Sequence, residues 1–95
     1  MKRKLVREEI GDQVYEYIPL GKYIVSAPGV CRGRPTFKYT RIEVAGILDR
    51  VAAGYPIDEI VAGFKGRFSR AALEEAIHLA ALALVRQSGP QARAK

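Results

Sequence analysis

The spacing of apolar residues changes near residue 43, and this change constrains the fold more than any other feature of the chain. Before it, short runs rich in β-branched and aromatic residues show the alternation of strands. After it, apolar residues recur three and four positions apart, as on one face of a helix. The sequence therefore predicts a single α+β domain, mainly extended over residues 1–42 and helical over residues 43–87, with a loose tail at residues 88–95.

The extended half predicts a β-hairpin and two further short strands. The expected strands cover residues 5–10, 13–18, 22–26 and 36–40. Gly11-Asp12 separates the first two, and a Gly-Asp pair between β-forming runs favours a tight hairpin turn. We expect Pro19 to end the second strand, because proline has no N–H to donate to a ladder.

The helical half predicts three helices joined by tight turns, an order typical of a helix-turn-helix. We expect Gly54 to end the first helix and Pro56 to start the second. Ser69 is expected to cap the third helix, because its hydroxyl can accept a hydrogen bond from an exposed backbone N–H. This helix should run to about Arg86 and stop at the Ser-Gly-Pro of residues 88–90.

The third helix becomes apolar on nearly all sides between residues 79 and 85. A helix that is apolar all round needs cover all round. A chain of 95 residues has little other surface to supply that cover. We therefore expect a homodimer with Leu79, Leu82 and Val85 near the contact.

Positive charge is concentrated in the extended half. The chain has 16 Lys and Arg against 10 Asp and Glu, a net charge of +6. Residues 1–42 hold a surplus of five basic side chains, and residues 43–95 a surplus of one. Such an excess suits a phosphate-bearing partner or an acidic protein surface, and it also serves solubility alone.

The start of the last helix is the first candidate for contact with DNA. In a helix-turn-helix, the N-terminal residues of the helix after the turn reach base edges in the major groove. Here these residues are Ser69 and Arg70, with Lys65 and Arg67 placed for phosphates. The adjacent Glu74-Glu75 pair comes one turn later, is expected to be solvated, and would repel the DNA backbone. A three-helix packing unit without a DNA role gives the same pattern.

The basic extended segment is the second candidate for contact with phosphates. Its cationic residues are Arg32, Arg34, Lys38 and Arg41. They suit a phosphate-contacting strand or arm, and they equally suit a solvated edge strand whose charges prevent sheet-to-sheet aggregation.

Catalysis has little support in the sequence, and we expect neither an enzyme nor a bound cofactor or metal. His78 lies among Ala and Leu, with no carboxylate or nucleophile at a suggestive spacing. Cys31 is the one cysteine, which fits a reducing cytoplasm. The longest apolar run is too short to span a bilayer, so we expect a soluble cytoplasmic protein. The absence of Asn and the single Met favour a thermophilic source.

Two groups of residues between positions 23 and 81 together form a pattern that can be compared with known families. The first group comprises Gly33, Pro35, Thr40, Arg41, Ile42 and Val44. The second comprises Ile47, Leu48, Gly54, Ile57 and Ile60. In both groups the chain resembles the small bacterial DUF433 family, a domain of unknown function with a helix-turn-helix-like part.

The resemblance implies an antitoxin-like protein, since members of the family resemble partners of PIN-like ribonuclease toxins. Such proteins are thought to bind DNA and the toxin as dimers. The expected function is thus a dimeric repressor that binds its operator and neutralises a PIN-like toxin. The alternative is a protein-interaction or scaffold module without nucleic-acid binding.

Two departures from the family pattern lie on either side of the second helix. Pro56 replaces a Ser-type cap, and residues 64–69, Phe-Lys-Gly-Arg-Phe-Ser, replace a stretch that often carries Tyr-Pro. The hairpin of residues 4–18 lies outside the resemblance altogether.

The resemblance also suggests roles at the junction of strand and helix. Thr40 is a candidate cap for the first helix. Arg41 is a candidate pin between strand and helix through Glu43 or Asp49, as well as a candidate contact. Of the loop residues, Arg32 and Arg34 are expected to be free for a phosphate or for an acidic toxin pocket.

Overall fold

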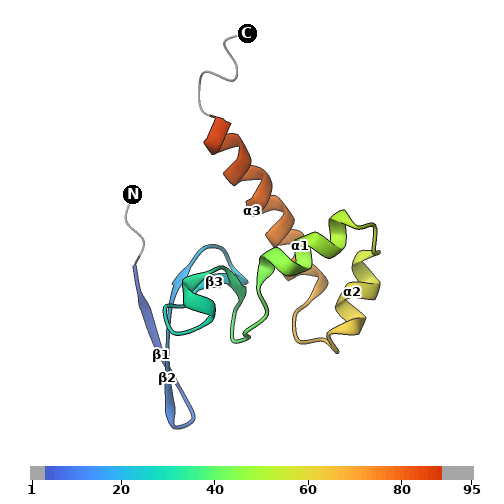
Figure 1. Ribbon diagram of the computed structural model, residues 1–95. Helices are drawn as coiled ribbons and strands as arrows, with labels where there is room; N and C mark the ends of the chain where they lie inside the picture. Colours follow the sequence, from blue (N-terminus) through green and yellow to red (C-terminus); the bar gives the residue numbers. More distant parts are fainter. Residues whose placement is uncertain (1–3, 89–95) are drawn as a thin grey trace.

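The computed structural model describes residues 4–88, which form a small antiparallel sheet beside three helices (Figure 1). The strands are β1 (Val6–Ile10), β2 (Gln13–Pro19), β3 (Ile24–Ser26) and β4 (Thr36–Phe37). The helices are α1 (Val44–Ala52), α2 (Ile57–Gly63) and α3 (Arg70–Ser88), and a 3₁₀ turn, η1, covers Cys31–Gly33. The predicted α+β fold, with strands before helices, is confirmed.

The sheet is a simple meander in which each strand pairs with the next, in the order β1-β2-β3-β4. Ile10 pairs with Gln13 across the predicted Gly11-Asp12 turn, where Gly11 has a φ of 60°. Glycine takes this left-handed conformation without the steric cost that other residues incur. Pro19 is the last residue of β2 and lies opposite Val25, so the predicted end of the strand is correct.

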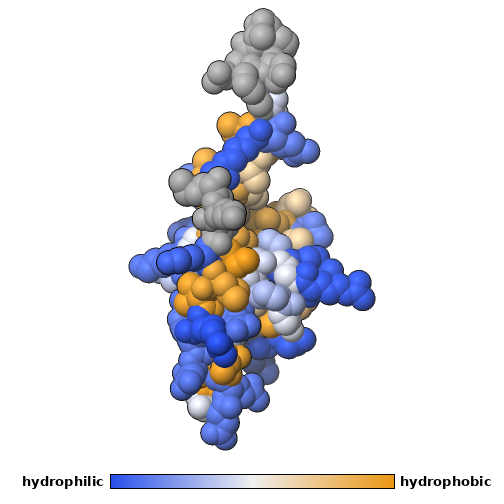
Figure 2. All heavy atoms as spheres, turned by 90° about the vertical axis from the view of Figure 1, so that its left-hand side faces the viewer, coloured by the Kyte–Doolittle hydropathy of each residue, from blue (hydrophilic) through white to orange (hydrophobic). Residues whose placement is uncertain are grey.

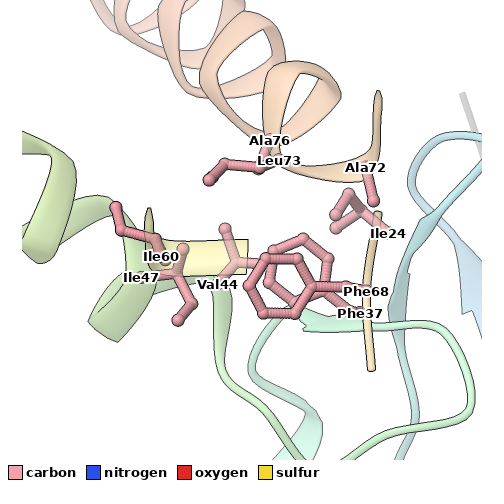
Figure 3. Close-up of a cluster of buried hydrophobic side chains, with 9 residues drawn as sticks. All are labelled: Ile24, Phe37, Val44, Ile47, Ile60, Phe68, Ala72, Leu73 and Ala76. Atoms are coloured by element: carbon pink, nitrogen blue, oxygen red, sulfur yellow. The ribbon is translucent and has the colours of Figure 1, made fainter. Parts of the chain in front are cut away.

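One hydrophobic cluster joins the sheet to all three helices (Figure 3). Its buried members are Ile24, Phe37, Val44, Ile47, Ile60, Phe68, Ala72, Leu73 and Ala76. At its centre the rings of Phe37 in β4 and Phe68 before α3 stack, with centroids 4.2 Å apart and planes 8° from parallel. This contact fixes the start of α3 against the strands.

The predicted cap of α3 is confirmed. The Ser69 hydroxyl accepts a hydrogen bond from the Ala72 N–H at 3.1 Å, as an N-cap does. Gly54 comes just after α1 with a φ of 100°, and Pro56 directly precedes α2. Thr40 does not cap α1, because its hydroxyl donates to the Phe37 carbonyl within the preceding turn.

Only the first half of α3 packs against the body of the protein. Ala72, Leu73 and Ala76 are buried, whereas every residue from position 80 to 88 is exposed. Figure 1 shows this second half extending away from the other elements. The helix continues two residues beyond the expected end at Arg86. Of the predicted loose tail, residues 89–95 lie outside the described residues.

Candidate nucleic-acid interface

The turn between α2 and α3 presents two cationic side chains beside the start of α3. Lys65 and Gly66 have left-handed φ angles of 56° and 73°, which reverse the chain between the two helices. Lys65, Arg67 and Ser69 are all exposed. Because backbone N–H groups give a helix N-terminus partial positive charge, this end of α3 favours a phosphate.

A hollow of about 250 Å³ lies between this turn and the turn after β4. Its lining consists of Tyr23, Phe37, Lys38, Tyr39, Gly66, Arg67, Phe68, Ser69 and Ala72. It brings together residues that lie about thirty positions apart in sequence, so Lys38 of the extended segment adjoins Arg67 and Ser69. Of the predicted DNA contacts, Lys38 from the extended segment and Arg67 and Ser69 from the start of α3 thus line one hollow.

Lys38 is held toward the hairpin by a carboxylate and two tyrosines. Its ammonium lies 4.0 Å from a Glu8 oxygen, 4.9 Å from the Tyr17 ring centroid and 5.1 Å from that of Tyr39. The contact with Tyr17 is the main cause that raises the pKa of Lys38. Tyr39 has a φ of 68°, unusual for a non-glycine residue, and its hydroxyl donates to Glu8 at 2.7 Å.

Arg34 is bound to Glu43, contrary to the expectation that it is free. Its guanidinium donates to both carboxylate oxygens, at 2.8 and 2.9 Å. This bidentate contact raises the pKa of Arg34 and lowers that of Glu43. The arginine that fastens the loop to the start of α1 is therefore Arg34. Arg41 is exposed, and its backbone carbonyl accepts a weak hydrogen bond from the Cys31 thiol.

Arg70, the predicted base contact, bridges α2 and α3. It donates to Asp58 at 2.6 Å and to Glu74 at 2.9 Å, and these contacts raise its pKa. Four other predicted contacts form no ion pair with an acid within residues 4–88. These four unpaired cations are Arg32, Arg41, Lys65 and Arg67.

Glu75 has a structural role that the sequence did not reveal. Its carboxylate accepts hydrogen bonds from the backbone N–H groups of Lys22 and Tyr23, at 2.8 and 2.7 Å. The prediction that both neighbouring glutamates are solvated is therefore wrong for Glu75. Glu74 is exposed, so one acid rather than two faces solvent near the start of α3. No local sequence signal marks this contact, because its partners lie more than 50 residues away.

An apolar groove of about 360 Å³ runs between α1 and α3. Its lining consists of Leu20, Ile24, Pro35, Val44, Ala45, Leu48, Ala76, Leu79, Ala80, Leu82, Ala83 and Arg86. Two predicted dimer residues, Leu79 and Leu82, belong to it, whereas Val85 lies outside it and is 69% exposed. Figure 2 shows hydrophobic side chains along α3 and over the body of the protein, bordered by hydrophilic ones.

Other chemistry has few candidate groups in the described part of the chain. His78 is exposed on α3, and Cys31 is half-buried in η1. Residues 4–88 contain no cluster of three metal-binding side chains. None of the helices described here combines the length and apolar character needed to cross a bilayer.

A comparison with protein families matches residues 24–80, which run from β3 through β4, α1 and α2 to the first half of α3. The matching family is described as a protein of unknown function, DUF433. No curated protein and no solved structure matches the chain. The match covers more than half of the sequence and leaves the β1-β2 hairpin outside it. The chain belongs to the DUF433 family.

Proposed function

We propose that the protein is a DNA-binding regulator of the antitoxin type that acts as a homodimer. The observation that carries this proposal is the pair of exposed cations, Lys65 and Arg67, beside the capped N-terminus of α3. In a helix-turn-helix, this is the end of the helix that enters the major groove, while flanking cations contact phosphates.

The charges of the other predicted contacts are compatible with DNA. The four unpaired cations are free of acidic partners within residues 4–88, so phosphates need not displace an existing ion pair. Arg34 and Arg70 are held in exposed ion pairs, which are weak in water and can exchange an acid for a phosphate. The inward-turned Glu75 also reduces repulsion near the start of α3.

The antitoxin part of the proposal rests on the family resemblance. A PIN-like ribonuclease has clustered aspartates, and exposed cations such as Arg32 and Arg41 suit an acidic pocket of that kind. The apolar groove also favours a protein partner, as a protein-interaction module without DNA binding would require.

Binding to DNA is tested by fluorescence anisotropy with a labelled duplex from the region upstream of the protein's own gene. Arg67→Gln should weaken binding and reduce the slope of log affinity against log salt by about 0.9, the value for one phosphate contact. Lys4→Gln removes the same charge before β1 and should leave the slope unchanged. An equal effect of both variants, or no binding by the wild type, would refute a specific phosphate contact at Arg67.

The antitoxin role is tested separately with a PIN-like protein encoded next to the gene. The protein should form a stable complex with it and suppress its ribonuclease activity. Failure of both, with DNA binding intact, would limit the function to DNA binding.

A further inference from the structure

The groove between α1 and α3 and the exposed end of α3 belong to one self-complementary surface. We propose that α3 of a second copy lies antiparallel in this groove, with the two-fold axis level with the Ala80-Ala81 peptide. This pairing deepens the homodimer part of the proposed function, and only its fit to DNA rests on that function.

The exposed half of α3 needs cover. Residues 80–88 have no buried member although they include Leu82, Leu84 and Val85. Short helical segments are marginally stable in water without packing of an apolar face. The groove beside this segment is lined almost entirely by apolar side chains. Placing a second helix there covers the groove together with Leu82, the exposed leucine of its lining.

A second copy fits this surface because the same helix face supplies both the wall and the occupant. Ala76, Leu79, Ala80 and Ala83 line the groove. Across the proposed axis, Leu79 of each copy lies level with Leu82 of the other, which is the pattern of an isologous interface. The alanines also allow two helix backbones to approach closely.

Charge limits where two copies of this chain can meet. Two chains of net charge +6 repel one another over most of their surfaces. Residues 76–85 contain no Lys, Arg, Asp or Glu, so this segment is where two copies meet without that repulsion. In the antiparallel register, Arg86 of each copy lies opposite Glu75 of the other. Arg86, the charged residue of the groove lining, therefore lies level with a carboxylate that the β2-β3 loop already holds.

The proposed register sets the distance between the two DNA-contacting ends. At a rise of about 1.5 Å per residue, the start of α3 lies about 16 Å from the axis. With helix axes about 8–10 Å apart, the two N-termini are about 33 Å apart. Half-sites one turn of DNA apart are separated by about 34–36 Å. The separation of the two helix ends in this pairing therefore matches that of successive major grooves.

Sedimentation equilibrium of the full chain tests the pairing through a matched pair of variants. Ala80→Glu places a charge in the groove lining and should convert the dimer to a monomer. Ala81→Glu is the same change one position later, outside the lining, and should leave the dimer intact. Both positions are exposed, so circular dichroism should show the helices retained in each variant.

A distance measurement tests the orientation without DNA. Spin labels at Ala71→Cys, in a Cys31→Ser background, should show one distance, of about 30 Å between labelled backbones. A parallel pairing would give about 10 Å. A monomeric wild type, a dimer that survives Ala80→Glu, or the short distance would overturn this proposal. None of these results would alter the anisotropy test of Arg67 as a phosphate contact.

Discussion

The carboxylate of Glu75, in the second turn of α3, accepts a hydrogen bond from the backbone N–H of Tyr23 at 2.7 Å. A second hydrogen bond, from the N–H of Lys22, joins the same carboxylate to the segment before β3. Both N–H groups lie in the loop between β2 and β3. One side chain therefore ties this loop to α3 and fixes the direction of the helix relative to the sheet.

Removing this carboxylate should destabilise the fold. We expect Glu75→Ala to lower the free energy of unfolding by about 1–3 kcal/mol, since two N–H groups lose a charged acceptor. Glu74→Ala removes a neighbouring carboxylate whose ion pair with Arg70 lies on the exposed surface, so its effect should be much smaller. Urea denaturation of both variants measures the difference, and equal losses would contradict the assigned role of Glu75.

Gly21 should be sensitive to a side chain only while Glu75 is present. A Cβ at this position would lie 2.7 Å from the Glu75 carboxyl group, which is closer than real Cβ contacts. We expect Gly21→Ala to destabilise the wild type and to have less effect in the Glu75→Ala background. The coupling in a double-mutant cycle should be about 1 kcal/mol. Additive effects would show that the two residues act independently.

The buried hydroxyl of Thr36 has no hydrogen-bond partner within residues 4–88, and the residue is 0% exposed. Thr36→Val replaces this hydroxyl with a methyl group and should stabilise the fold by about 1 kcal/mol. Thr40→Val is the matched control, because the Thr40 hydroxyl donates to Phe37 and accepts from the Ile42 N–H. Thr40→Val should therefore be less stable than the wild type. Comparing the thermal unfolding midpoints of Thr36→Val and Thr40→Val with that of the wild type measures both effects.

Glu8 should link the hairpin to the turn after β4 in a pH-dependent way. Hydrogen bonds from Tyr17 and then Tyr39 hold its pKa below the ordinary 4.5, with attraction by Lys38 adding to them. Because the pKa is lowered on folding, this contribution to stability is present above pH 4.5 and is lost as the pH falls through the lowered value.

Glu8→Gln should therefore lower the urea midpoint at pH 7 and differ less from the wild type at acidic pH. Glu9→Gln, at an exposed neighbouring position, provides the control and should show no such pH dependence. A constant difference between wild type and Glu8→Gln across the acidic range would argue against the linkage.

Arg32 and Arg34 should differ in their contributions to DNA binding. Both lie in the same loop, but only Arg34 is held by Glu43. We expect Arg32→Ala to flatten the dependence of log affinity on log salt by about 0.9, and Arg34→Ala to change it less. Glu43→Gln should free Arg34 and steepen the dependence. Identical slopes for the two alanine variants would show that the ion pair does not restrain Arg34.

The sequence predicts most of the fold because its signals are local. The period of apolar residues places the helices, and Gly11 and Ser69 mark a turn and a cap through their own chemistry. Contacts between distant segments leave no such local mark. The partners of Glu75 and the stacking of Phe37 on Phe68 are therefore visible only in the folded protein.

In the candidate interface, too, the sequence predicts the local features but not the contacts between distant segments. The cations near α3 are identifiable from composition and from the helix-turn-helix order. The acidic partners of these cations are not identifiable in this way. Arg32 and Arg34 both adjoin Gly33 in sequence, yet of the two it is Arg34 that pairs with Glu43. The apolar end of α3 is evident in the sequence, whereas the groove beside it depends on how α1 packs.

The division of α3 into a packed half and an exposed half has an evolutionary consequence. Substitutions before Ala76 alter the hydrophobic cluster that the whole domain shares. Every residue from position 81 to 88 is exposed. Selection can therefore change the surface of the last two turns of this helix with little effect on the cluster that holds the domain together.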